Sequence, residues 1–392
     1  MRYFMKQSKK VAVLAILVLM LAASALAQGL PKADSPESVG FSSERLAKIS
    51  ASLQKDVDQG KIPGAVLMIV RHGKVAYFEA FGYQDLEKKI PMKRDSIFRI
   101  ASMTKPVTSV ATMMLVEEGK IQLIHPVSRY LPEFKNLKVG VEKTDPATGK
   151  KELAMVPAER EMTVQDLLRH TSGITYAFFG KSMVKDLYLK TKEGNPFSFD
   201  QTNAEMAAKL SKLPLQYQPG TTWDYSMSPA VLGRIIEVVS GMELDAFIAE
   251  RIAKPLQMTD SAFWTVGPER LGRLAEAAVD PKTGKRPGFD VSKRPRWIGG
   301  DVGMVSTASD YARFTQMLLN RGILDGVRLL SPKTVDLMAS NHLPPGTKFA
   351  PDALSQYLDS LPSPEMGQGF GLGFTVRTEA GMNPNPGSVG TY

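Results

Sequence analysis

Strand-like patterns occur near both ends of this chain, whereas its middle has mostly helical spacing. The strand-like segments are residues 65–70, 75–81, 97–100 and 370–377. The clearest helical patterns between residues 121 and 287 are at 164–169, 203–210 and 228–240. Because the strands of one sheet must lie together, we expect the two ends of the chain to meet, with a helical region inserted between them. The cleft between two such lobes is a natural place for a ligand site.

Composition agrees with a large globular protein and excludes several kinds of site. With 392 residues, the chain is longer than a single hydrophobic core usually supports. It has no cysteine, which excludes disulfides, thiolate metal sites and cysteine nucleophiles. Its net charge of +9 comes in part from four basic residues in the first ten positions, and we interpret the remaining, scattered basic residues as solvated surface. Nucleic acid is therefore not a predicted partner.

Residues 1–27 have the three parts of a secretory signal. Four basic residues and no acid lie in the first ten positions, an apolar run follows from Val11 to Ala23, and Ser24–Ala27 provides a small-x-small cleavage site. An uncleaved anchor is the alternative, but residues 11–27 are shorter than the span of about 20 that a bilayer needs. We expect cleavage after Ala27 and a periplasmic or secreted protein that meets the membrane only through this signal.

A serine and a lysine in the spacing Ser-x-x-Lys lie on one face of a helix. There a neutral amine can accept the serine proton as the hydroxyl attacks a carbonyl. The spacing occurs three times, at Ser52–Lys55, Ser102–Lys105 and Ser182–Lys185. We interpret Lys55 as solvent-facing on a surface helix, and Ser182 as part of an irregular polar region, so neither pair is a predicted site.

Ser102 has the context that a nucleophile needs. It follows the strand-like segment 97–100 and opens a helical pattern over residues 102–118, and Pro106 suits an early helical position. Free N–H groups at a helix start favour a developing oxyanion. Apolar neighbours predict that this helix is buried, which favours a neutral Lys105 amine. The alternative is a helix N-cap with a surface lysine nearby.

A tyrosine is the next candidate, in a turn that leads into a helix. Tyr225 lies in the segment Gln218–Ser226, and its phenol can share proton transfer with Lys105 if it projects into the cleft. A packing aromatic is the alternative. The four histidines have no metal-binding spacing, so no metal or cofactor is implied, and we interpret His170 as structural. Lys282–Gly284 matches Lys-Thr-Gly but lies in a polar loop, so we do not assign it to the site.

Five segments, in order along the chain, resemble the family of class C β-lactamases, D-alanyl-D-alanine carboxypeptidases and family VIII carboxylesterases. They are Ile62–Gly64, Phe98–Lys105, Leu167–Gly173, Pro219–Ser226 and Gly299–Leu319. The resemblance covers the chain from about Ser35 to its end. It implies an α+β fold, with an antiparallel sheet flanked by helices and an all-helical lobe. We expect residues 28–105 and 291–392 to form the first lobe and residues 106–290 the helical lobe.

The resemblance also implies a mechanism. Ser102 would be acylated by a small-molecule ester, amide or β-lactam, and water would then release the acyl group. Lys105 and Tyr225 would act together as the general base. The oxyanion would lie between the Ser102 backbone N–H and an N–H from a late edge strand.

Two departures from the family pattern bear on the activity. Class C β-lactamases have Tyr-x-Asn where this chain has Tyr225-Ser226-Met227, and methionine cannot donate a hydrogen bond to an amide carbonyl. The family's third motif should follow Gly387–Tyr392, so we expect the last strands and the C-terminal helix to be missing. The leading prediction is a serine hydrolase resembling a carboxylesterase. The alternatives are a β-lactamase, a D-alanyl-D-alanine carboxypeptidase, or a penicillin-binding-like module without turnover.

Overall fold

The computed structural model describes residues 29–190, 198–265, 267–351 and 363–392. The predicted signal, residues 1–27, lies outside the described residues, so its cleavage and the localisation stay predictions. Within the described ranges, no helix is both long enough and apolar enough to span a bilayer.

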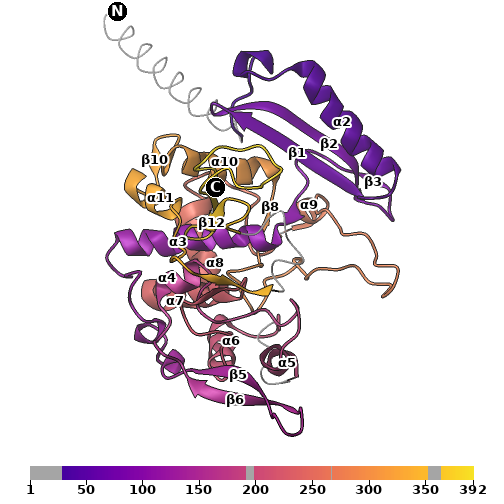
Figure 1. The fold of residues 1–392 in the computed structure, drawn as a ribbon. Coiled ribbons are helices and arrows are strands. Elements are labelled where there is room, and N and C mark those ends of the chain that lie inside the picture. Colours follow the sequence, from indigo (N-terminus) through magenta and orange to yellow (C-terminus); the bar gives the residue numbers. More distant parts are fainter. Residues whose placement is uncertain (1–28, 191–197, 266, 352–362) are drawn as a thin grey trace, which may run out of the picture.

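The N-terminal region is a helix packed on an antiparallel sheet (Figure 1). Its elements are α2 (Ser43–Asp58), β1 (Gly64–Arg71), β2 (Lys74–Asp85) and β3 (Ile90–Pro91). Helix α2 begins where the Ser42 side chain accepts a hydrogen bond from the Arg45 N–H. Its apolar stripe buries Leu46 against Tyr77 and Phe81 of β2. The two predicted strand-like segments and the surface helix around Lys55 are confirmed here, and β2 extends further than the predicted residues 75–81.

Helix α3 (Thr104–Glu117) crosses the middle of the molecule (Figure 1). Its residues from Val107 to Leu115 are almost all buried, because they are apolar or small on every side. Helices α7 (Ser228–Ser240) and α8 (Leu244–Ile248) pack against it. The predicted burial of this helix is confirmed, and it gives the segment around Ser102 a rigid support.

The middle region is mainly helical, as predicted, but it also contains a β-hairpin. Its helices are α4 (Val164–Leu168), α5 (Met183–Lys190), α6 (Asn203–Leu210), α7, α8, a π-helical turn (Ala249–Ala253) and α9 (Gly267–Leu271). The hairpin pairs β5 (Lys138–Thr144) with β6 (Lys151–Pro157). The prediction of an all-helical lobe was therefore wrong at this point. Most of the hairpin is exposed, so charged side chains mask the two-residue period that marks a strand.

The C-terminal region packs on the N-terminal one through α10 (Ala308–Leu319), but its described strands pair outside the β1–β2–β3 sheet, so the two ends meet without sharing that sheet. Its elements are β8 (Val305–Ser306), α10, β9 (Ile323–Leu324), β10 (Val327–Arg328), α11 (Pro332–Met338), β11 (Lys348–Phe349), β12 (Gln368–Phe370) and β13 (Thr375–Arg377). Strand β8 pairs antiparallel with β4 (Phe98–Arg99), and α10 packs against β1. The segment 370–377, predicted as one strand, instead contains the last residue of β12, the turn and the whole of β13.

The short strand β7 (Thr222–Trp223) pairs in parallel with β11 and leads into the loop before α7. The mixed α and β architecture with antiparallel strands thus confirms the predicted fold class, with the β5–β6 hairpin as an addition. Its consequence for the site is that β4, α3 and the loop before β8 meet in one place.

Candidate active site

Ser102 lies at a sharp turn between β4 and α3. It belongs to a short 3-10 helix, Ala101–Met103, and α3 proper begins only at Thr104. Ala101 has a φ of 43°, in the left-handed region that residues with a Cβ rarely adopt. Such strained positions cluster at functional sites. The turn leaves Ser102 exposed although the helix that follows is buried.

Lys105 points from the first turn of α3 toward this serine. Its Nζ lies 3.1 Å from the Ser102 Oγ and 2.9 Å from the backbone carbonyl oxygen of Asp301. The lysine is only 3% exposed. The alternative of a surface lysine beside a helix N-cap therefore does not describe this pair. An amine so placed can exchange a proton with the serine hydroxyl.

The loop before β8 is fixed on the start of α3 by hydrogen bonds. The Thr108 hydroxyl donates to the Gly300 carbonyl oxygen at 2.7 Å, and the Met304 N–H donates to the Thr104 hydroxyl at 3.1 Å. A Cβ on Gly300 would lie 2.7 Å from the Pro229 carbonyl oxygen, so a side chain has no room there. These contacts set the position of the Asp301 carbonyl that Lys105 meets.

A buried acid lies directly beside Lys105. Asp301 is fully buried, and the Tyr176 hydroxyl donates to its Oδ2 at 2.6 Å. Burial raises the pKa of Asp301, while the positive charge of Lys105 and the Tyr176 hydrogen bond oppose that rise. Burial, and next the charge of Asp301, holds the pKa of Tyr176 well above its ordinary value, so Tyr176 acts as a donor. Neither residue was a predicted site residue.

Tyr225 lies in the loop between β7 and α7 and lines the same cavity as Ser102 and Lys105. Its ring centroid is 4.6 Å from the Lys105 Nζ, a cation–π distance. The structure therefore brings together the three predicted site residues. Met227, two residues later, is buried in the main core and is not among the cavity-lining residues.

His170 also lines this cavity, although the sequence indicated a structural role. The Ser226 N–H donates to its Nδ1 at 3.2 Å, so the neutral ring carries its proton on Nε2. Burial, and next the charge of Lys105, holds the pKa of His170 well below its ordinary value. The ring centroid lies 4.9 Å from that of Tyr225, and the His170 carbonyl accepts from the Asp224 N–H. His170 thus supports the Tyr225 loop as a neutral group.

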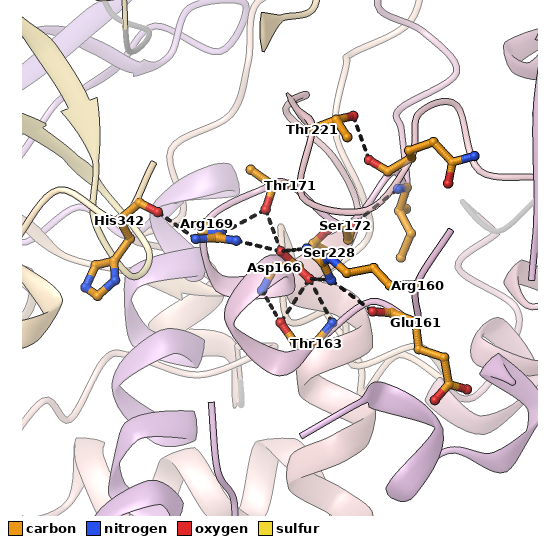
Figure 2. Close-up of polar contacts among 12 residues, drawn as sticks. Arg160, Glu161, Thr163, Asp166, Arg169, Thr171, Ser172, Thr221, Ser228 and His342 are labelled. Atoms are coloured by element: carbon orange, nitrogen blue, oxygen red, sulfur yellow. Dashed lines mark hydrogen bonds and ion pairs between the residues drawn. The ribbon is translucent and has the colours of Figure 1, made fainter. Parts of the chain in front are cut away.

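An ion-pair network fixes the segment that leads to His170, as Figure 2 shows. Asp166 is fully buried and accepts hydrogen bonds from Arg160 at 2.6 Å and from Arg169 at 2.9 Å. The Thr171 hydroxyl also donates to it, at 2.8 Å. Burial alone would raise the pKa of Asp166, but hydrogen bonding and the charges of both arginines lower it to about 2. Arg169 further donates to the His342 carbonyl oxygen, which links this segment to the C-terminal region.

The cavity has a volume of about 660 Å³ and is walled mostly by aromatic and apolar side chains. Its lining residues are Ser102, Met103, Lys105, Pro106, His170, Tyr176, Phe178, Phe179, Tyr225, Val302, Tyr311, Phe370, Gly373, Phe374 and Thr375. Among these lining residues, Lys105 is the one with a formally charged side chain. Met103 and Phe178 are 45% and 53% exposed, which is high for apolar side chains. A site of this size holds a drug-sized molecule with a large apolar part.

The other motif copies lie outside the cavity lining. Ser52 and Lys55 are both exposed on α2. Ser182, predicted to lie in an irregular region, instead stands at the start of α5, where its hydroxyl accepts from the Lys185 N–H. Lys282 is in an exposed turn around Asp280, as predicted. Tyr176, Phe178 and Phe179 were missed because they lie in an irregular segment without periodicity; their aromatic density was the available signal.

The family model named Beta-lactamase matches residues 49–391. The chain therefore belongs to the Beta-lactamase family, as the resemblance predicted. It is similar to Protein Rv1367c of Mycobacterium tuberculosis, with 36% identity over 350 residues, 87% of this chain and 82% of that protein. It is also similar to Esterase EstB of Burkholderia gladioli, with 34% identity over 230 residues, 57% of this chain and 53% of that protein.

A solved structure agrees in fold. EstCE1, described as a hydrolase with promiscuous acyltransferase activity, superposes with a TM-score of 0.68 and 28% identity. The match covers 88% of this chain and 87% of EstCE1.

Proposed function

We propose that this protein is a serine hydrolase that cleaves uncharged, apolar carboxylic esters through an acyl-enzyme on Ser102. The observation that carries the proposal is the 3.1 Å contact between the Ser102 Oγ and the Lys105 Nζ at an apolar cavity. Ser102 is exposed to an incoming substrate, whereas Lys105 is buried and its amine donates a hydrogen bond to the Asp301 carbonyl oxygen.

The proposed reaction has two similar halves. The Ser102 oxygen attacks the ester carbonyl carbon, and its proton passes to Lys105 in the neutral form, assisted by Tyr225. The tetrahedral intermediate collapses, the carbon–oxygen bond to the alcohol breaks, and the alcohol leaves with that proton. Water then attacks the acyl-enzyme, the same groups take and return a proton, and the carboxylic acid is released. The positive end of the helix start at Ser102 favours the oxyanion in both halves.

Two features support an ester rather than a β-lactam or a stem peptide. β-Lactams and peptides ending in D-alanine carry a carboxylate, and among the described lining residues only Lys105 offers a full positive charge. Met227 replaces the asparagine of class C β-lactamases and is buried away from the lining. The similarity to an esterase and to a hydrolase with acyltransferase activity agrees with acyl transfer from an ester.

A comparison of substrates tests the proposal. We would measure kcat/KM of the full chain for p-nitrophenyl butyrate and for a chromogenic cephalosporin, with Ser102→Ala as the inactive variant and Ser182→Ala as the matched control. We expect a strong preference for the ester, lost in Ser102→Ala and kept in Ser182→Ala. A preference for the cephalosporin would instead indicate a β-lactamase. Stoichiometric acylation without turnover would indicate a penicillin-binding-like module.

A further inference from the structure

The Ser–Lys mechanism leaves one buried acid of the site without a role. Asp301 contacts Lys105 through its backbone carbonyl, at 2.9 Å from the Nζ. Its carboxyl is fully buried, and its Oδ1 has no hydrogen-bond partner in the described part of the chain. A buried ionisable group of this kind is costly unless something nearby stabilises it, and such groups concentrate at functional sites.

Burial raises the pKa of this carboxyl, and two neighbours oppose that rise by favouring its ionised form. The Tyr176 hydroxyl donates to the Oδ2 at 2.6 Å, and a hydrogen bond of this kind stabilises a carboxylate more than a neutral acid. Lys105 supplies the nearby positive charge, and its Nζ also lies 5.4 Å from the Tyr176 ring centroid. Tyrosine, acid and lysine therefore form one contiguous buried group behind Ser102.

We propose that Asp301, held by Tyr176, is a positioning residue whose negative charge sets the pH range in which the Ser102–Lys105 pair is active. The inference rests on the proposed hydrolase function. The carboxylate lies directly behind the Ser102–Lys105 pair, so its charge acts on each step in which the pair takes or gives up a proton. The backbone carbonyl of the same residue meanwhile keeps the Lys105 amine at hydrogen-bond distance from the serine.

The other titratable groups around Asp301 come from three segments. Lys105 belongs to α3, Tyr176 to the segment after α4, and Tyr225 to the loop before α7. His170 also lies in the segment after α4, and it is neutral because burial, and next the charge of Lys105, holds its pKa well below the ordinary value. The carboxylate of Asp301 is thus the negative charge that this group of residues contributes.

The sign of the effect follows from charge alone. Asp301→Asn keeps the shape and the Tyr176 contact but removes a negative charge, so loss of a proton from the pair becomes easier. The acidic limb of the kcat/KM profile, which reports the free enzyme, should move to lower pH by roughly one unit. Tyr176→Phe removes the donor, so Asp301 keeps its own proton to higher pH. We expect a smaller movement in the same direction.

Asp310→Asn is the matched control, because Asp310 is also buried and also accepts from a hydroxyl, that of Ser261 at 2.9 Å. It does not line the cavity. We expect it to lower the melting temperature and to leave the acidic limb unmoved. A variant that merely damaged the fold would behave in this way, so the contrast separates positioning from general destabilisation.

The experiment combines pH profiles of ester hydrolysis with an NMR titration of the full chain labelled with ¹³C-lysine, in which Lys105→Arg identifies the Lys105 signal. In Asp301→Asn both the acidic limb and the midpoint of the Lys105 signal should move to lower pH. If neither moves in Asp301→Asn or in Tyr176→Phe, the inference is overturned. If the wild-type protein cleaves no ester, the proposed function fails, and the NMR midpoint alone then decides the role of Asp301.

Discussion

Two copies of Ser-x-x-Lys in this protein have equally buried lysines and yet opposite arrangements. Lys105 and Lys185 are each 3% exposed. The Lys105 amine lies 3.1 Å from its serine, whose hydroxyl faces the cavity. The Lys185 amine instead donates to the carbonyl oxygen of Phe179. Ser182 in turn donates to Gln216 at 2.6 Å and accepts from the Lys185 N–H, so its hydroxyl is already engaged.

The difference teaches that the partner of the lysine amine, rather than the spacing or the burial, decides what the motif does. At Ser102 the strained turn at Ala101 keeps the hydroxyl open to substrate. At Ser182 the same spacing has a structural role: Lys185 donates a hydrogen bond to the backbone of Phe179, a residue that lines the cavity. One copy is proposed to carry the chemistry, and the other supports the wall that a substrate would contact.

The largest expected effect separates the two lysines by activity. Lys105→Ala should lower kcat/KM for p-nitrophenyl butyrate by roughly 10³-fold, because a positioned proton acceptor contributes about that much. Lys185→Met should change the same constant only a few-fold. Steady-state kinetics of both purified variants gives the comparison. Equal losses in the two variants would contradict the assignment of separate roles.

A second expected effect concerns the buried ion-pair network of Asp166, which fixes the segment leading to the active site. Asp166→Asn should lower the free energy of unfolding by about 3 kcal/mol, because it leaves two arginines without their buried partner. The pKa of Asp166 in the folded protein, about 2, is below its unfolded value. Its stabilisation is therefore complete above about pH 4 and is lost as the pH falls toward 2.

Urea unfolding at several pH values measures this effect. The difference between wild type and Asp166→Asn should be constant near neutral pH and should shrink between pH 4 and pH 2. A difference that stays the same down to pH 2 would mean that the Asp166 charge does not stabilise the fold.

A smaller effect should appear at the Ser182–Lys185 copy. Lys185→Met removes the hydrogen bond to Phe179 and so loosens the aromatic wall. We expect KM to rise about three-fold for a naphthyl ester, whose large aromatic group contacts that wall. KM should stay unchanged for a small ester such as p-nitrophenyl acetate. A three-fold rise corresponds to less than 1 kcal/mol of binding free energy. Parallel KM measurements with the two esters test this. A rise in KM of the same size for both would locate the damage elsewhere.

The smallest expected effects belong to the serines outside the cavity. Ser182→Ala should cost about 1 kcal/mol of stability, since it loses a helix-start hydrogen bond, with kcat unchanged. Ser52→Ala on the exposed face of α2 should change neither the stability nor kcat. Thermal unfolding and ester-hydrolysis kinetics of the two variants test these expectations. Loss of turnover in Ser182→Ala would break the comparison altogether.

Local patterns were enough to predict β1, β2 and α7, because each has one apolar face or a regular strand period. Ser102 was predicted to open a helix after a strand-like segment, and Tyr225 to lie in a turn before a helix. The joint role of Ser102, Lys105 and Tyr225 was predicted only through the resemblance to the family. The pairing of Tyr176 with Asp301 was not predicted, because the two residues are 125 positions apart and only the tertiary fold brings them together. Ser182 was predicted to lie in an irregular polar region, and the structure instead places it at the start of α5.

The contacts that fix Lys105 have a consequence for when the site can exist. Lys105 and its carbonyl partner at Asp301 are 196 positions apart, and Thr104 and its partner Met304 are 200 apart. Such long-range contacts close only after most of the chain is available, and they form slowly. A growing chain that has passed Lys105 therefore holds both residues of the pair without the loop that orients them. Assembly of the proposed nucleophile is thus a late event, tied to completion of the fold.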